Sequence, residues 1–208
     1  MSIILNSFKW ILDNLVLVVG DYGIAIVCLT LIVRMFLLPF SIKQKKDLVK
    51  QQEVTNKINS IKEKYKNNSK ALEGELAKYQ GEYLKSFGGC LVLIIQAPIM
   101  MSLYGVIRSI ATNEGTVLVP WVSNISLSDP YFILPIIYMI FMVLPTIFDY
   151  LYNKPKSNES NIKTMLIMNL IFALLISIKL PVGLAIYLIT FAAFSFGENL
   201  VYKVFLKN

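Results

Sequence analysis

The apolar stretch that decides the fold lies near the N-terminus and reads YGIAIVCLTLIVRMFLLPF over residues 22–40. A helix needs about 20 consecutive, mainly apolar residues to cross the hydrocarbon core of a bilayer. This stretch meets that requirement, and the charged side chain within it belongs to Arg34. The stretch therefore predicts a membrane-spanning helix that carries one charge in an apolar setting.

The composition of the whole chain also favours a membrane protein. Hydrophobic residues make up 56% of the 208 residues and charged residues 16%, whereas soluble domains carry about 25% charged residues. The mean hydropathy is +0.61. A chain of this length cannot bury so much apolar surface in a water-soluble core. We therefore expect lipid to be the solvent for much of the chain.

Four further apolar stretches have a length close to that of a membrane span. They cover residues 88–107, 131–148, 164–180 and 181–197. Pro181 follows Lys179 between the last two stretches, and a proline at such a point ends one helix and starts the next. The sequence therefore predicts an all-α membrane protein with five transmembrane helices, the last two joined by a tight turn.

Residues 1–20 differ from the spans, because polar side chains recur there along one helical stripe. The recurring residues are Ser2, Asn6, Lys9 and Asp13. Apolar residues surround the stripe, and this pattern is typical of an amphipathic helix in the membrane interface, with Trp10 at the level of the headgroups. A signal peptide is the second interpretation, but the segment lacks a basic start and a small-x-small cleavage site.

Basic residues are distributed unequally between the two sides of the predicted spans. The segment 41–87 holds eleven lysines, the loop 149–163 holds three and the tail 198–208 holds two. The other side, which includes the loop 108–130, carries Lys9, Arg108 and Lys179. Because basic loops remain in the cytoplasm, we expect the N-terminus outside and the C-terminus inside.

The segment 41–87 also carries a helical pattern. Apolar residues repeat at four, three and four residues on either side of the polar turn 66–70, at Val54, Ile58, Ile61 and Tyr65 and again at Leu72, Leu76, Tyr79 and Tyr83. Two such stripes predict an antiparallel helical hairpin in the cytoplasm. Its lysine-rich outer faces suit anionic headgroups or RNA. For any single lysine, an ordinary solvated surface is the simpler interpretation.

Arg34 is the most informative single residue. An arginine at mid-membrane costs about 2.5–3.5 kcal/mol even on a lenient insertion scale, so it usually faces a polar cavity or a partner. No acid lies deep in a predicted span, since Asp149 and Glu198 stand at cytoplasmic ends. The alternative is that the side chain snorkels past Phe40 to the headgroups. Both interpretations remain open, and Thr30, one turn away on the same face, slightly favours a polar groove.

Other polar residues inside the predicted spans are candidates to line the same groove. They are Gln96, Thr146, Asn169, Tyr187, Thr190 and Ser195. Each alone more often acts as an interhelical hydrogen-bonding residue. Tyr187 and Thr190 share a helical face, which favours a joint role.

The sequence argues against enzymatic chemistry. It contains no histidine, no GxxxxGK[ST] or GxGxxG motif, and no nucleophile paired with a base or pair of carboxylates within a span. Cys28 and Cys90 lie far apart in apolar stretches, so we interpret them as small buried hydrophobic residues and not as a disulfide or metal site. We therefore expect no cofactor, no metal and no enzyme.

Several stretches together resemble the YidC family of bacterial membrane protein insertases, related to the mitochondrial oxidase-assembly and chloroplast thylakoid insertases. The similar stretches are Tyr22–Ile26 with Leu29–Arg34 and Leu38–Gln44, Gly88–Leu91 with Ile95–Ile99 and Leu103–Tyr104, Asp129–Pro135, and Leu180–Tyr187. They occur in the family's order over nearly the whole chain, which becomes a single insertase domain on this interpretation.

The resemblance implies a five-helix core around a hydrophilic groove that is open to the cytoplasm and the lipid. Its groove residues, carried onto this chain, are Arg34, Thr30, Gln96 and Tyr187. The chain departs from the family's pattern at Leu188, where an aromatic residue is frequent, and at Phe191-Ala192, where a Ser-Asn pair is usual. The glutamine that some relatives have near Thr146 is also missing. These departures predict a less polar groove.

The function implied is insertion of newly made membrane proteins into the bacterial inner membrane. The expected partners are nascent membrane proteins and the lipid bilayer, with the ribosome and the general secretion channel as further candidates, and no specific nucleic-acid target. Two alternatives remain open: an assembly chaperone without autonomous insertion, and a small transporter or channel subunit. The absence of internal repeats and of paired intramembrane charges weighs against a transporter.

Overall fold

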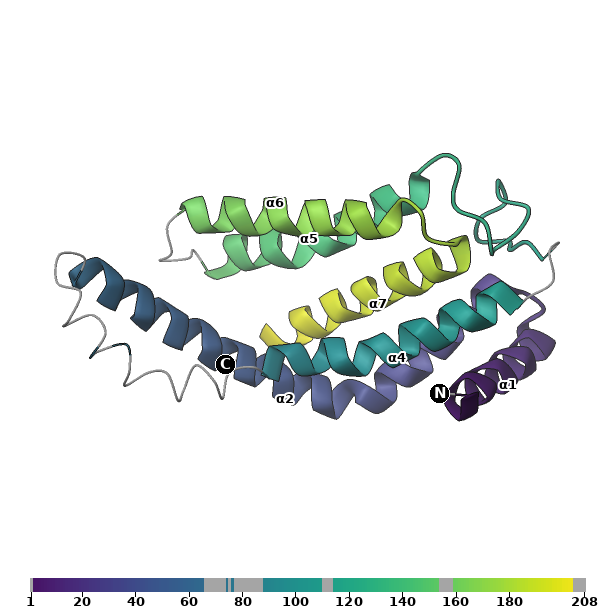
Figure 1. The fold of residues 1–208 in the computed structure, drawn as a ribbon, viewed down its shortest axis with the longest axis horizontal. Coiled ribbons are helices and arrows are strands. Elements are labelled where there is room, and N and C mark those ends of the chain that lie inside the picture. The colour runs from purple at the N-terminus through teal and green to yellow at the C-terminus, as the bar shows by residue number, and fades with distance from the viewer. Residues whose placement is uncertain are drawn as a thin grey trace. The chain divides into compact units, whose positions relative to one another are not determined.

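Six helices are described in the computed structural model, which describes residues 2–65, 74, 76, 88–109, 114–153 and 159–203. They are α1 (Ser2–Val19), α2 (Tyr22–Lys64), α4 (Gly88–Ser109), α5 (Ile133–Asn153), α6 (Glu159–Ser177) and α7 (Val182–Val201) (Figure 1). Within these ranges the chain forms no strand, and one isolated bridge joins Ser128 and Pro181. The predicted all-α fold is thus confirmed for the described residues.

The helices differ in their ability to cross a membrane. Among the described residues, Tyr22–Asp47 and Val182–Val201 are long and apolar enough to do so, by length and composition alone. Two shorter apolar helical segments cover Ile133–Phe148 and Leu166–Ser177. A non-helical break separates α6 from α7, as Lys179 and Pro181 predict. The crossing of five helices and their orientation stay predictions.

The helix that contains the first apolar stretch extends well beyond the predicted span 22–40. Helix α2 continues through Pro39 and past residue 40 to Lys64. A proline inside a helix removes one backbone hydrogen bond and causes a clash with the preceding turn, so it bends or ends the helix, and here the helix continues. The second arm of the predicted hairpin lies outside the described residues, apart from positions 74 and 76.

The chain forms two compact units, and two helices are shared between them. The first unit consists of Met1–Phe36 and Ile99–Asn208, and the second of Leu37–Pro98. Helix α2 leaves the first unit after Phe36, and α4 returns to it at Ile99. A proline lies inside the helix close to each of these two points: Pro39 in α2 and Pro98 in α4.

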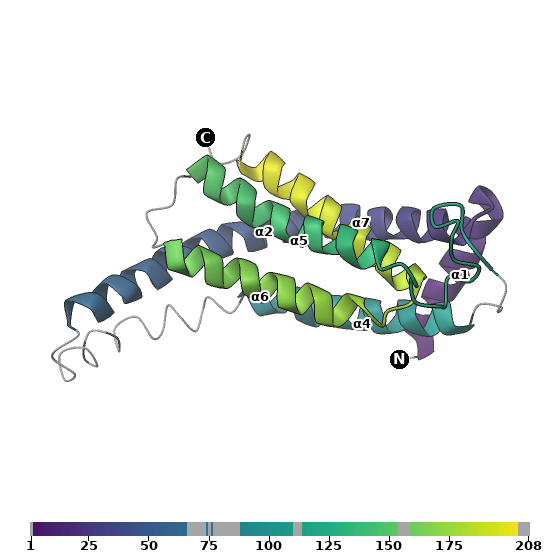
Figure 2. The same cartoon turned by 90° about the horizontal axis from the view of Figure 1, so that it is seen from above.

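The first unit has a continuous apolar core. Helix α5 packs against both α6 and α7, and the three helices lie side by side in Figure 1 and Figure 2. The largest fully buried side chains come from all parts of the unit and include Leu12, Ile26, Leu103, Ile107, Ile125 and Leu184. Near the start of α7, a Cβ on Gly183 would lie 3.0 Å from Cδ1 of Ile107 and 3.2 Å from Cδ1 of Ile26. The absence of a side chain at Gly183 therefore lets three helices approach closely.

A folded loop, residues 114–132, joins the helix ends on one side of this unit. The carboxylate of Asp21, just before α2, accepts hydrogen bonds from the Ile24 amide, the Thr116 hydroxyl and the Val117 amide. The backbone amides of Val182 and Gly183 donate to the carbonyls of Leu127 and Ile125. The loop thus fixes the start of α2 to the start of α7.

A second carboxylate orders the other end of the same loop. Asp129 is 5% exposed and accepts hydrogen bonds from Nε1 of Trp121 and from the amides of Tyr131 and Leu134. The amide of Leu134 belongs to the first turn of α5, where no intrahelical acceptor is available. Asp129 therefore stabilises the start of α5 as a capping residue does.

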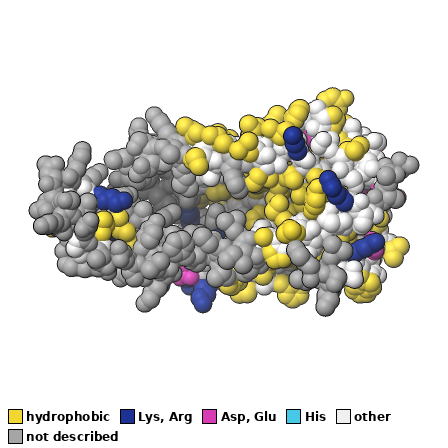
Figure 3. All heavy atoms as spheres, viewed as in Figure 1, with side chains coloured by type: hydrophobic (Ala, Val, Ile, Leu, Met, Phe, Trp, Pro, Cys, Tyr) yellow, Lys and Arg dark blue, Asp and Glu magenta, His cyan; other side chains and the backbone are white. Residues whose placement is uncertain are grey.

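The outer surface of the first unit is largely apolar. In the part of Figure 3 that is not grey, hydrophobic side chains cover much of the face, with a few basic side chains among them. Exposed large residues recur along α5 and α6 and include Ile136, Ile140, Ile147, Leu151, Ile167, Met168, Ile171 and Leu175. Helix α1 buries Leu12 and leaves Trp10, Leu17 and Val18 exposed. An apolar surface of this extent fits lipid as the surrounding solvent.

We predict that Asp21 makes the fold sensitive to acid. Burial raises the pKa of Asp21, but the hydrogen bonds from Ile24, Val117 and Thr116 outweigh it and hold the pKa below the ordinary 3.8. A depressed folded-state pKa contributes stability that is present above pH 3.8 and is lost as the pH falls through the folded-state value. The difference in Tm between the wild type and Asp21→Asn, measured by thermal unfolding in detergent, should shrink over that range. A constant difference across the range would contradict the prediction.

We also predict that Gly183→Ala destabilises the first unit. The added methyl group would press on Ile107 and Ile26, and overpacking of this kind costs about 1–3 kcal/mol. When Ile107→Val is added to Gly183→Ala, it removes the carbon atom nearest to the new methyl group and should recover part of the lost stability. Gly197→Ala is the matched control in the same helix, because nothing lies within 4 Å of its Cβ, and it should be neutral or stabilising by up to about 1 kcal/mol. Denaturant unfolding in detergent measures all three variants.

Candidate functional site

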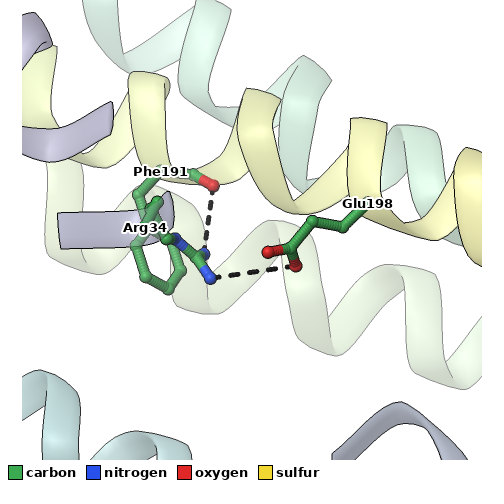
Figure 4. A network of polar contacts seen from close by, with 3 residues as sticks. All are labelled: Arg34, Phe191 and Glu198. Carbon is green, nitrogen blue, oxygen red and sulfur yellow. Dashed lines mark hydrogen bonds and ion pairs between the residues drawn. The ribbon is translucent and has the colours of Figure 1, made fainter. Parts of the chain in front are cut away.

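The side chain of Arg34 lies on α2, in the first unit, and points to α7 (Figure 4). Its side chain is 9% exposed. The sequence allows two interpretations, a side chain that faces a polar cavity or partner and one that snorkels to the headgroups. The guanidinium is buried against protein groups, so it has a partner inside the protein, while a polar groove stays a prediction.

Phe191 on α7 makes the closest contacts with Arg34. The Nη2 atom donates a hydrogen bond of 3.2 Å to the Phe191 carbonyl, and the guanidinium carbon lies 3.4 Å from the centre of the Phe191 ring. The ring of Phe194 lies at 5.8 Å. A guanidinium over an aromatic face is attracted by the negative centre of the ring, the more strongly when water is excluded. Phe191 thus provides both a polar and an aromatic contact.

Glu198 provides the opposite charge. Its Oε2 lies 4.0 Å from Nη1 of Arg34, and its side chain is 5% exposed. The expectation that no acid lies deep enough to neutralise Arg34 is therefore wrong. The reason is that α7 continues to Val201, beyond the predicted end at residue 197, so that Glu198 is a helical residue and not the start of a tail.

The residues around Arg34 form one stripe of α7. Tyr187, Phe191, Phe194 and Glu198 follow one another at spacings of four, three and four, which places them on one helical face. The rings of Tyr187 and Phe191 lie 6.2 Å apart. This spacing is visible in the sequence, and the stripe ends in an acid. It is the sequence feature from which Phe191, Phe194 and Glu198 could have been identified as partners of the arginine.

The pair between Arg34 and Glu198 is loose. Charge-assisted N–H···O hydrogen bonds measure about 2.7–2.9 Å, and this contact is longer. Two unit charges at such a distance attract by about 4 kcal/mol at an effective dielectric constant of about 20, while each buried ion costs several kcal/mol to remove from water. In addition, Nε of Arg34 is buried and has no hydrogen-bond partner among the described residues. The site therefore retains an unused donor.

The other predicted site residues fall into three groups. Thr30 and Thr190 donate their hydroxyl hydrogens to carbonyls of their own helices, at Ile26 and Ile186. Thr146 on α5 and Tyr187 on α7 are buried in the first unit. Gln96 is half-buried in α4 and belongs to the second unit. The structure thus brings Arg34 together with α7, and the two threonine hydroxyls are already used locally.

Among the described residues, no group of three or more His, Cys, Asp or Glu side chains is placed to hold a metal ion. Cys28 is a free, half-buried cysteine, and the side chain of Cys90 lies outside the described residues. The site consists of one cation, one anion and an aromatic surface. Such a site can bind polar or charged groups.

Apolar helices around a buried charge define the class as an α-helical membrane protein. A family model described as "60Kd inner membrane protein" matches residues 14–208, and the chain belongs to this family. The membrane protein insertase YidC of Polynucleobacter necessarius is 30% identical over 188 residues, covering 90% of this chain and 33% of the relative. That of Paraburkholderia phymatum is 29% identical over 200 residues, covering 96% and 36%.

A solved structure shares the fold. The crystal structure of an active YidC insertase with its first transmembrane domain resolved has a TM-score of 0.70 and 27% identity, and the match covers 93% of this chain and 44% of that chain. The family predicted from the sequence is confirmed. The chain spans about a third of the length of the curated relatives. These relatives are named for membrane protein insertion and not for an enzymatic reaction, in agreement with the prediction that the chain is not an enzyme.

We predict that the Phe191 ring stabilises the buried arginine. Phe191→Leu keeps the carbonyl and most of the volume but removes the aromatic face, and should lower the free energy of unfolding by about 1–2 kcal/mol. Phe36→Leu, at a side chain that is 81% exposed, is the matched control and should stay within about 0.5 kcal/mol of the wild type. Equal effects of the two substitutions on denaturant unfolding would show that the contact with the ring contributes nothing.

Proposed function

We propose that this chain is a membrane protein insertase, which accepts newly made membrane proteins from the cytoplasmic side and releases their apolar segments into the bilayer. The observation that carries the proposal is Arg34, a cation held inside an apolar helix, in a chain whose relatives are named as insertases. Intramembrane cations are costly and are usually functional. The mechanism needs no nucleotide and no covalent step.

The first step is the entry of a hydrophilic client tail. A hydrophilic groove of the first unit lined by Arg34, Thr30, Thr146, Tyr187 and Thr190 would replace part of the water that the tail loses. Arg34 contributes most, because its charge attracts the carboxylates of an acidic tail and the unused Nε donor can bind an oxygen of the client. The barrier to crossing falls by the part of the desolvation cost that these contacts offset.

The second step is the release of the apolar segment to lipid. The exposed apolar side chains of α5, such as Ile136 and Ile140, offer a surface along which a client segment can move. Burial of the client's own apolar surface in lipid supplies about 25 cal/mol per Å². This term drives release, and the chain needs only to lower the barrier for the polar part.

The proposed setting is the inner membrane, with the N-terminus outside and the C-terminus in the cytoplasm. The lysine excess of the segments 41–87, 149–163 and 198–208 supports this orientation. In it, the loop 114–132 lies outside and closes the core there, while the basic cytoplasmic hairpin receives clients, from the ribosome or beside the secretion channel. An assembly chaperone that needs the secretion channel is the alternative.

The test is insertion of a single-span client with an acidic N-terminal tail into liposomes that contain only this protein. Protection of the tail from added protease reports crossing. We expect protection with the wild type and a loss of about tenfold with Arg34→Ala, equivalent to about 1.4 kcal/mol at 25 °C. Arg34→Lys should retain part of the activity, because it keeps the charge without the planar fork.

The controls separate the possible outcomes. Phe36→Leu should insert the client as the wild type does, since the side chain is exposed. If protection persists in both Arg34 variants, the insertase function still stands, but the role of the Arg34 charge is refuted. No protection above empty liposomes would refute autonomous insertion and favour the chaperone that depends on the secretion channel.

A further inference from the structure

Glu198 bears on how Arg34 meets a client. The carboxylate lies 4.0 Å from the guanidinium, and both side chains are at least nine-tenths buried. Without a client, the charge of Arg34 is therefore largely compensated by an acid of the same chain. An incoming carboxylate meets a pair of opposite charges and not an isolated cation, which weakens its attraction to the site.

The geometry of the pair makes exchange feasible. A client carboxylate that reached Arg34 at about 2.8 Å would form a shorter and stronger contact than the resident one. It would also find the unused Nε donor, so that two parallel N–H···O bonds become available. Phe191 holds the guanidinium by its carbonyl and ring in either case. One carboxylate can thus replace another once Glu198 moves aside and opens the buried Nε to the client.

We propose that Glu198 is a specificity-determining residue, an internal counter-ion that acidic client tails must displace from Arg34 and neutral tails need not. This inference rests on the proposed insertase function. It predicts that Glu198 lowers the preference for acidic tails and lets the chain accept neutral ones. Removing the carboxylate should raise the acidic preference, and removing Arg34 as well should abolish that gain.

The experiment uses the full chain in liposomes and two single-span clients that differ only in two tail residues, Asp-Asp or Asn-Asn. The measured quantity is the ratio of protease-protected acidic client to protected neutral client. An exposed charge pair changes an equilibrium constant by up to about fivefold. Because this pair is buried, Glu198→Gln should raise the ratio of acidic to neutral client by about fivefold to tenfold. The double variant Arg34→Ala/Glu198→Gln should show the same ratio as Arg34→Ala alone.

Glu114→Gln is the matched control, because it removes the same charge from an exposed residue of the loop 114–132. It should leave the ratio unchanged. Glu198→Asp keeps the charge but withdraws it by one methylene, and should raise the ratio by less than Glu198→Gln does. If Glu198→Gln does not fold, as judged by its unfolding in detergent, the ratio measured with Glu198→Asp tests the counter-ion role in its place.

The outcomes separate this inference from the proposed function. Insertion by the wild type with an unchanged ratio in the folded Glu198 variants would refute the counter-ion role and leave the insertase. An equal rise in the double variant and in Glu198→Gln would refute it too, because the effect would not pass through Arg34. Failure of the wild type to insert either client would refute the proposed function itself.

Discussion

The contact on which the site depends is the burial of Arg34 against α7. A cation inside an apolar helix is costly unless protein groups replace its water, and here a carbonyl, an aromatic ring and a carboxylate do so. All three belong to two residues of one stripe, Phe191 and Glu198. The register of α7 relative to α2 is therefore constrained by these polar and aromatic contacts as well as by apolar packing. The loop 114–132 joins the starts of the same two helices.

Much of the fold could be predicted from the sequence, because apolar length and proline positions are strong local signals. Residues 22–40 predicted a helix, and Lys179 with Pro181 predicted the break before α7. The end of the first helix could not be predicted, since α2 continues through Pro39, a residue that locally disfavours a helix.

The site was predictable only in part. Arg34 stands out in any apolar stretch, but its partners depend on which face of α7 meets α2, and that is set by tertiary packing. Glu198 was placed just beyond the predicted span, which ends at residue 197, whereas α7 continues through it to Val201. Thr30 and Thr190 were correctly placed within helices, yet their hydroxyls bond to their own backbones, which competes with any bond to a client.

The two prolines near the unit boundary have a mechanical consequence. Each connection between the units is a continuous helix, and a helix transmits force along its axis far better than a loop does. Pro39 and Pro98 each remove one backbone hydrogen bond near the boundary. Each of the two helices is therefore easiest to bend near the boundary of the units and stiffer on either side of its proline.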